Sequence, residues 1–203
     1  MNARVLISIW LVGMGLILAL LPNNQTTMGQ LKPSELVEKM KQNDGLISVD
    51  QLARLLVNED STILLIDLRS PDEYKECNIP GSVNIPYAKL MDKEFGGYLE
   101  QNEMKRIFYS NSEIISTQAW VLVAEMDYKN TFILQGGMNS WYQTVMNGRF
   151  EGERITAREN ALFETRMKAR NLFIETNSLP DSIRFQFKIA KQKNRKKLDG
   201  GCG

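Results

Sequence analysis

The sequence predicts an α/β fold with a mostly parallel sheet flanked by helices. Residues 63–66 and 131–134 are short, continuous apolar runs, as expected of parallel strands that are buried on both faces. Segments with apolar residues at helical spacing alternate with these runs, and such alternation favours parallel pairing. The chain has 203 residues, of which 43% are hydrophobic and 24% charged, so it belongs to the globular class.

The predicted elements begin with an apolar helix within residues 5–21 and a linker at 23–30. A helix near 34–43 follows, and Ser48 is expected to cap a second helix at 49–57. Strands are predicted at 63–66, within 79–86 and at 107–109, with a loop at 95–98. A helix at 117–126, a strand at 131–134, a charged helix at 157–173 and a strand at 183–189 complete the series.

The N-terminal run is expected to meet a membrane. Residues 5–21 carry no charge and lie between Arg4 and Pro22. Their number falls between that of a signal-peptide core and a full transmembrane span, and no Ala-x-Ala cleavage site follows, so we favour an uncleaved single-pass anchor over a cleaved signal or a buried helix. Arg4 and the ten residues without positive charge after the span favour an extracytoplasmic domain, although nearby lysines argue the reverse: Lys32, Lys39 and Lys41.

Composition excludes several classes of site. The chain has no histidine, which removes the usual general base near neutral pH and the commonest zinc ligand. Its two cysteines, Cys77 and Cys202, are too few for a Cys-rich metal site, and we expect neither a metal nor a cofactor. Residues 184–203 carry net +6 against a total of +1, which leaves −5 for residues 1–183. Nucleic acid is not an expected partner, because no aromatic-basic recognition face is evident.

Three ordered motifs give the sequence a family resemblance. They are DLRSPDEY at residues 67–74, IPGSVNIP at 79–86 and QGGMNSW at 135–141. Together they resemble the signatures of a rhodanese domain, the sulfurtransferase fold, over about residues 45–147. The expected organisation is an anchor at 1–22, a linker and helix at 23–44, a rhodanese-like domain at 45–147, and a C-terminal helix, strand and basic Gly-Gly-Cys-Gly tail at 148–203.

The turn after the strand at 107–109 departs from that family. In a rhodanese this turn carries a cysteine nucleophile, which must be a thiolate to attack sulfur, and an arginine. Here the resemblance places Ser110 and Ile115 at those positions, and Glu113 where glycine is usual. We call residues 110–115 the degenerate loop and expect no catalytic residue in it; its members are Ser110, Asn111, Ser112, Glu113, Ile114 and Ile115. Because three positions differ, natural loss of activity explains the loop better than a single engineered substitution.

Other conspicuous residues are expected to be structural. Asp67 and Arg69 should fix loop hydrogen bonds, and Trp141 should anchor the core. Cys77 lies away from the turn and is predicted to be a small, partly buried side chain. For Cys202, near Lys196 and Lys197, three alternatives stay open: a tethered thiol that carries sulfur or forms a mixed disulfide, a processing or attachment tail, and an inert end.

Residues after 149 are expected to form a separate appendage. In the segment 183–189 apolar residues occupy every odd position, which predicts a strand with one buried face. That strand either docks on its own domain or pairs with a partner's sheet edge. The basic residues that follow are suited to anionic lipid head groups.

These observations favour a membrane-anchored, catalytically inactive rhodanese-like module that binds or organises partners, in other words a pseudoenzyme. A protein partner is expected through residues 183–189 or the degenerate loop. One alternative is a sulfur-relay or thiol-redox protein that uses Cys202 as its sulfur-carrying thiol. A second is an accessory subunit of a membrane complex, which the anchor, the strand and the basic tail would serve together.

Overall fold

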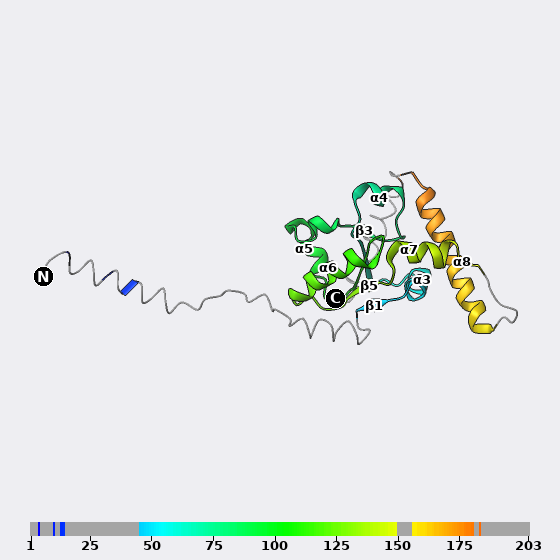
Figure 1. Ribbon diagram of the computed structural model, residues 1–203, viewed down its shortest axis with the longest axis horizontal. Coiled ribbons are helices and arrows are strands. Elements are labelled where there is room, and N and C mark those ends of the chain that lie inside the picture. Colours follow the sequence, from blue (N-terminus) through cyan, green and yellow to red (C-terminus); the bar gives the residue numbers. More distant parts are fainter. Residues whose placement is uncertain are drawn as a thin grey trace, which may run out of the picture. The chain divides into compact units, whose positions relative to one another are not determined.

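The computed structural model describes residues 4, 10, 13, 14, 45–149, 156–180 and 183. Residues 45–180 belong to one compact unit, whose centre is a parallel sheet with strand order β1-β5-β4-β2-β3 (Figure 1). The strands are β1 (Leu46–Ile47), β2 (Ile63–Asp67), β3 (Val83–Asn84), β4 (Lys105–Tyr109) and β5 (Thr131–Leu134). The predicted α/β class with a mostly parallel sheet is confirmed, and every pairing between these strands is parallel.

The register aligns the ends of the two central strands. Ile63 of β2 lies opposite Lys105 of β4, and Asp67 lies opposite Tyr109. The turns that follow β2 and β4 therefore leave the sheet side by side at its carboxyl edge, where open parallel sheets usually place their functional groups.

The helices cover both faces of this sheet. They are α3 (Val49–Val57), α4 (Pro71–Glu76), α5 (Gly96–Leu99), α6 (Glu113–Glu125), α7 (Gly137–Trp141) and α8 (Ala157–Ser178), with two 3-10 helices, Tyr87–Lys89 and Lys93–Phe95, and a π-helix, Tyr142–Met146. Ser48 caps α3 as predicted: its Oγ accepts a hydrogen bond from the Gln51 N–H at 3.2 Å. The predicted loop at 95–98 is wrong, because short helices occupy 93–99. α6 begins at Glu113, four residues before the predicted start.

Alternation along the strands divides the apolar residues between two clusters. Odd-numbered residues of β2 and β4, such as Leu65 and Ile107, pack with α3, α7 and α8. Even-numbered residues, such as Ile66 and Phe108, pack with α5 and α6 on the opposite face. The sheet is thus buried on both sides, which explains why its strands are continuously apolar in sequence.

α8 is an integral part of this packing. The sequence predicted a helix from Ala157 to about Phe173, but not its docking, and the helix runs five residues further. Ala169 and Phe173 are buried in the cluster that contains α3 and α7. Arg166 forms a bidentate ion pair with Asp50 of α3, with Nε–Oδ1 at 2.7 Å and Nη2–Oδ2 at 2.8 Å. Figure 1 shows α8 lying along the side of the domain that carries α3 and α7.

The predicted strand at 183–189 does not include Ile183, the single position of that segment that is described. Ile183 is helical, its N–H donates to the Pro180 carbonyl at 2.9 Å, and its side chain is 49% exposed. Residues 184–189 lie outside the described residues, as do the predicted helix at 34–43, the linker at 23–30, Cys202 and almost all of the predicted anchor at 1–22.

Within the ranges that the structure describes, no helix has both the length and the apolar character that crossing a membrane requires.

Candidate functional site

The degenerate loop connects β4 to α6 at the carboxyl edge of the sheet. Ser110 directly follows the buried Tyr109 and is itself only 6% exposed. Ser112 occupies the N-cap position of α6 without a capping side-chain hydrogen bond. Asn111 is exposed, and Ile114 in the first helical turn is 67% exposed. A turn does join the strand to a helix here, as predicted, but it is shorter than predicted because α6 already begins at Glu113.

Backbone contacts hold the loop against the turn between β5 and α7. The Met138 N–H donates to the Ser110 carbonyl at 2.8 Å, and the Asn139 N–H donates to the Asn111 carbonyl at 3.1 Å. Gly137, the residue before Met138, has φ +58°, and a Cβ on it would stand 2.4 Å from the Ser110 carbonyl oxygen. Only glycine combines this left-handed backbone with so close an approach. The glycine was part of a sequence motif, but the contact it permits was not predicted.

A carboxylate links the same two turns. The Gly136 N–H donates to Oε1 of Glu113 at 2.5 Å. The N–H of Gly136, which lies beside the degenerate loop, is thus already hydrogen-bonded to a carboxylate of that loop. The sequence shows that Glu113 is the charged residue of the degenerate loop, but not which partner it binds.

A second carboxylate reaches the loop from α4. Oε1 of Glu73 accepts a hydrogen bond from Asn111 Nδ2 at 2.6 Å, while its Oε2 accepts from the Ser70 hydroxyl at 2.7 Å and the Ser70 N–H at 3.0 Å. The Ser70 hydroxyl, followed by the Asn111 amide, lowers the pKa of Glu73 below its ordinary value. Sequence reasoning missed Glu73 as a neighbour of the loop, although its capping-box spacing from Ser70 was visible.

A buried ion pair lies at the carboxyl end of β2, where Asp67 is the last residue of the strand and Arg69 follows in the next loop. Arg69 Nε donates to Asp67 Oδ1 at 3.0 Å, and Arg69 Nη2 donates to Oδ2 at 2.6 Å, with both residues buried. Burial acts to lower the pKa of Arg69, but the hydrogen bonds and charge of Asp67 outweigh it and raise that pKa above its ordinary value. The predicted structural role of this pair is confirmed, and its positive charge is already neutralised.

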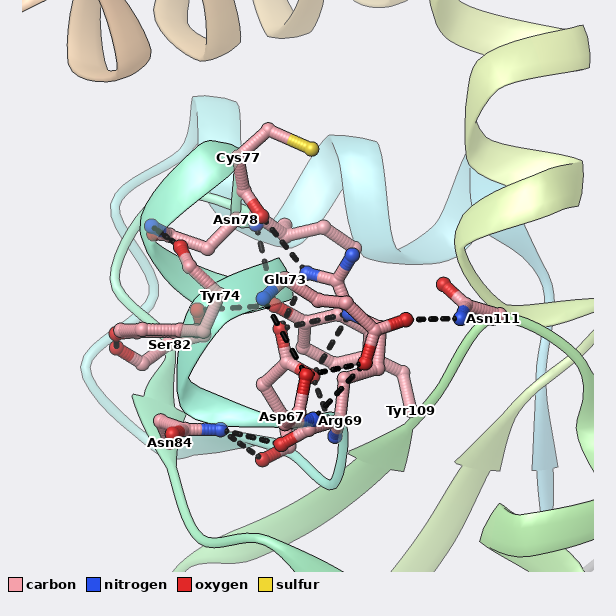
Figure 2. Close-up of polar contacts among 12 residues, drawn as sticks. Asp67, Arg69, Glu73, Tyr74, Cys77, Asn78, Ser82, Asn84, Tyr109 and Asn111 are labelled. Atoms are coloured by element: carbon pink, nitrogen blue, oxygen red, sulfur yellow. Dashed lines mark hydrogen bonds and ion pairs between the residues drawn. The ribbon is translucent and has the colours of Figure 1, made fainter.

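Figure 2 shows how this pair is fixed. Arg69 Nη2 also donates to the Cys77 carbonyl at 2.8 Å, which ties the loop after α4 to the strand end. The Tyr109 hydroxyl donates to Ser82 Oγ at 3.0 Å and accepts from the Ile79 N–H at 3.2 Å. Burial, followed by the negative charge of Asp67, raises the pKa of Tyr109 well above its ordinary value, so this phenol stays protonated.

The remaining candidate side chains are packed into the domain. Ile115 is partly buried and packs with the apolar cluster that contains α6. Trp141 is completely buried, as predicted for a core anchor. Cys77 is half-buried, and its Sγ accepts a hydrogen bond from the Tyr142 hydroxyl at 3.4 Å. Burial, followed by that contact with Cys77, raises the pKa of Tyr142 to about 12.

Chemically, this part of the domain offers the hydroxyl of Ser110 and two carboxylates that already accept hydrogen bonds, Glu73 and Glu113. Ser110 would need a base to become a nucleophile, whereas Glu113 accepts from Gly136 and Glu73 accepts from Ser70 and Asn111. Among the residues that the structure describes, no three His, Cys, Asp or Glu side chains gather as a metal site.

Comparison with known proteins identifies the domain that contains this sheet. The model of the rhodanese-like domain matches residues 48–144, which span β2, β4, β5 and the degenerate loop. This chain contains a rhodanese-like domain. The match ends before α8, so the helix that completes one side of the core lies beyond the part that defines the family.

The proteins that are similar to this rhodanese-like domain include a sulfurtransferase and a centrosomal protein. Thiosulfate:glutathione sulfurtransferase of Saccharomyces cerevisiae is 27% identical over 127 residues, which cover 58% of this chain and 91% of that protein. Centrosomal protein of 41 kDa B of Xenopus laevis is 32% identical over 100 residues, which cover 46% of this chain and 27% of that protein. The chain thus spans about a quarter of the centrosomal relative's length.

A solved structure gives a comparable match. The crystal structure of a Bacillus halodurans protein is 23% identical, covers 64% of this chain and 99% of its own, and has a TM-score of 0.46.

Proposed function

We propose that this chain is a catalytically inactive rhodanese-like module that binds or organises a protein partner. The observation that carries the proposal is the chemistry of the degenerate loop. Where the family's sulfur-carrying cysteine is expected, the chain has Ser110, and where its arginine is expected, it has the partly buried Ile115. The five-stranded sheet of the domain is present, and this supports a fold that is retained without the family's reactive groups.

The first argument concerns the nucleophile. Sulfur transfer through a persulfide needs a thiolate, and a serine hydroxyl is far less acidic. A serine would require a general base with a pKa near the working pH. Glu73 does not meet this requirement, because the Ser70 hydroxyl and the Asn111 amide lower its pKa. The chain has no histidine to take that role.

The second argument concerns charge. A sulfur donor such as thiosulfate is an anion, and it should be attracted by backbone N–H groups and an arginine. Here Glu113 occupies one such N–H, and Glu73 binds Asn111 of the loop. Two like charges 4 Å apart repel by about 1 kcal/mol in water and about 4 kcal/mol at the effective dielectric of a protein surface. The carboxylates at the degenerate loop therefore repel the anionic sulfur donor that the reaction needs.

The test is a sulfur-transfer assay on the full chain, with thiosulfate as donor and either glutathione or cyanide as acceptor. We expect no rate above the uncatalysed reaction. A rate that is lost in Ser110→Ala would refute the proposal. A rate that survives in Ser110→Ala and is lost in Cys202→Ser would instead support the sulfur-relay alternative.

We also propose that residues 1–22 hold this module in a membrane on its extracytoplasmic side. The support is the uncharged run at 5–21 and the lack of a good cleavage site after it. N-terminal sequencing of the protein from fractionated cells tests this: an intact N-terminus in the membrane fraction is expected. A mature N-terminus near Gln30 in a soluble fraction would exclude the anchor.

A further inference from the structure

A cavity lies between the end of the π-helix and α8. Its volume is about 230 Å³, and both elements contribute to its lining, which consists of Met146, Asn147, Gly148, Arg149 and Arg170. The match to the rhodanese-like domain ends at residue 144, so all five residues lie beyond the part of the chain that defines the family. None of them belongs to the degenerate loop, and the cavity is therefore a separate candidate site.

The two elements that form the cavity are fixed against each other. α8 packs against the π-helix, and the Tyr142 ring lies edge-on to the Phe173 ring with centroids 5.7 Å apart. Met146, the last residue of the π-helix, packs against the buried cluster that contains α3 and α7. The Asn147 N–H donates to the Tyr142 carbonyl at 2.8 Å, where the helix ends. The cavity is thus built on the packed core of the domain.

Two arginines give this cavity a positive charge. Arg170 is partly buried on α8, and Arg149 is exposed. Neither forms a hydrogen bond or an ion pair with any residue that the structure describes, whereas Arg166, one turn earlier on α8, is paired with Asp50. Among the described residues that line the cavity, none is acidic. The C-terminal end of a helix contributes only about half a negative charge, which is less than the charge of two guanidinium groups.

Charge and size both indicate the ligand. Two guanidinium groups around one space repel each other unless a negative group lies between them. Arginine binds phosphate and carboxylate oxygens through parallel N–H donors, and a dianionic phosphate balances two arginines whereas a carboxylate balances one. The cavity is smaller than the roughly 300–1,000 Å³ of sites for drug-sized ligands, so it suits a single small group. The exposed Asn147 amide adds further donors at the same place.

We propose that this cavity binds a phosphate group, either as the free ion or as the end of a small phosphate ester. Arg149 holds the phosphate oxygens from the end of the π-helix, and Arg170 holds them from α8. Bound phosphate therefore links these two elements and stabilises the folded chain. The site is separate from the degenerate loop, so the proposal holds whether or not that loop transfers sulfur.

The test is a titration of the full chain in non-ionic detergent with inorganic phosphate, followed by phosphorus NMR at constant ionic strength. Glycerol phosphate is the ester probe, and acetate is the singly charged competitor. Arg149→Gln and Arg170→Gln each remove one guanidinium group. The matched control is Arg158→Gln, which changes an exposed arginine of α8 that does not line the cavity. Thermal melting checks that each variant is folded, and Arg170→Lys keeps the charge if Arg170→Gln does not fold.

We expect saturable binding of one phosphate per chain. Either glutamine substitution in the cavity should weaken it about tenfold, because each removes a charged hydrogen-bond donor, and Arg158→Gln should leave it unchanged. Arg170→Lys should weaken it less than Arg170→Gln, because the lysine keeps the charge but loses the paired donors. Tighter binding of glycerol phosphate than of phosphate would identify an ester as the ligand, and the reverse would identify the free ion.

Three results would overturn the proposal. The first is the absence of saturable binding by the folded wild type, and the second is an equal loss of affinity in Arg158→Gln or displacement of phosphate by equimolar acetate. The third is phosphate binding that occurs only after Glu151→Gln with Glu153→Gln, since acids of the chain itself would then neutralise the two arginines.

Discussion

Replacing Phe173 by alanine tests whether α8 is part of the core of the rhodanese-like domain. Phe173 is only 4% exposed and packs in the cluster formed with α3 and α7. Its ring lies edge-on to Tyr142, with centroids 5.7 Å apart at 79°, and 6.2 Å from Trp141 at 40°. Truncation removes these contacts and leaves a space beneath the helix.

The expected loss follows from those contacts. Burying a phenylalanine is worth about 1.5–3 kcal/mol, and a favourable aromatic pair adds about 0.5–1.5 kcal/mol. The sum agrees with the roughly 3–5 kcal/mol usually lost in Phe→Ala core substitutions. We use the lower end, about 3 kcal/mol, because α8 covers one side of the core and the site can partly collapse. For a chain of this length, that corresponds to a fall in Tm of roughly 6–12 °C.

The assay is urea denaturation of the full chain, with Ile174→Ala as the matched control. Ile174 is the next residue of the same helix but is 48% exposed, so its truncation should cost under about 1 kcal/mol. If Phe173→Ala is no more destabilising than Ile174→Ala, α8 is not part of the cooperative core and the packing argument fails.

Three further substitutions test the candidate site. Gly137→Ala should cost about 2–4 kcal/mol in denaturation, because it puts a Cβ at φ +58° against the loop backbone, whereas Gly97→Ala, with open space around it, should be nearly neutral. Asp67→Asn should cost about 3–5 kcal/mol, because it leaves the Arg69 guanidinium buried and unpaired; a loss below about 1 kcal/mol would contradict the pairing. Glu73 has a lowered pKa, so its contribution to stability is present above its ordinary pKa of 4.5 and is lost as the pH falls through the folded-state value. The difference in urea midpoint between wild type and Glu73→Gln should therefore shrink from about pH 6 to about pH 3, and a constant difference would refute this.

Local signals were strong enough to predict most of the fold. The strand predicted at 63–66 lies within β2, and the predicted cap at Ser48 gave the correct start of α3. β1 was missed because a two-residue strand carries almost no periodicity. The short helices at 93–99 were missed because two adjacent glycines favour a loop in local reasoning.

The long-range contacts could not be predicted in the same way. Sequence reasoning predicted that Ser110, Glu113 and Ile115 depart from the family, on the positions that the three motifs assign to them. The bond from Gly136 to Glu113 and that from Asn111 to Glu73 depend on how distant turns meet at the sheet edge. Likewise, the packing of α8 against the domain could not be predicted from its charged sequence, because this packing depends on a few residues such as Ala169 and Phe173.

The most direct test of the central claim is stepwise restoration of the degenerate loop, measured as sulfur transfer from thiosulfate by the full chain. We expect no activity in the wild type and at most weak activity in Ser110→Cys, because Ile115 cannot stabilise the developing negative charge. Ser110→Cys combined with Glu113→Gly and Ile115→Arg should be clearly active. A folded triple variant without activity would contradict the claim that the frame of a sulfurtransferase is intact, and full activity in Ser110→Cys alone would contradict the argument from charge.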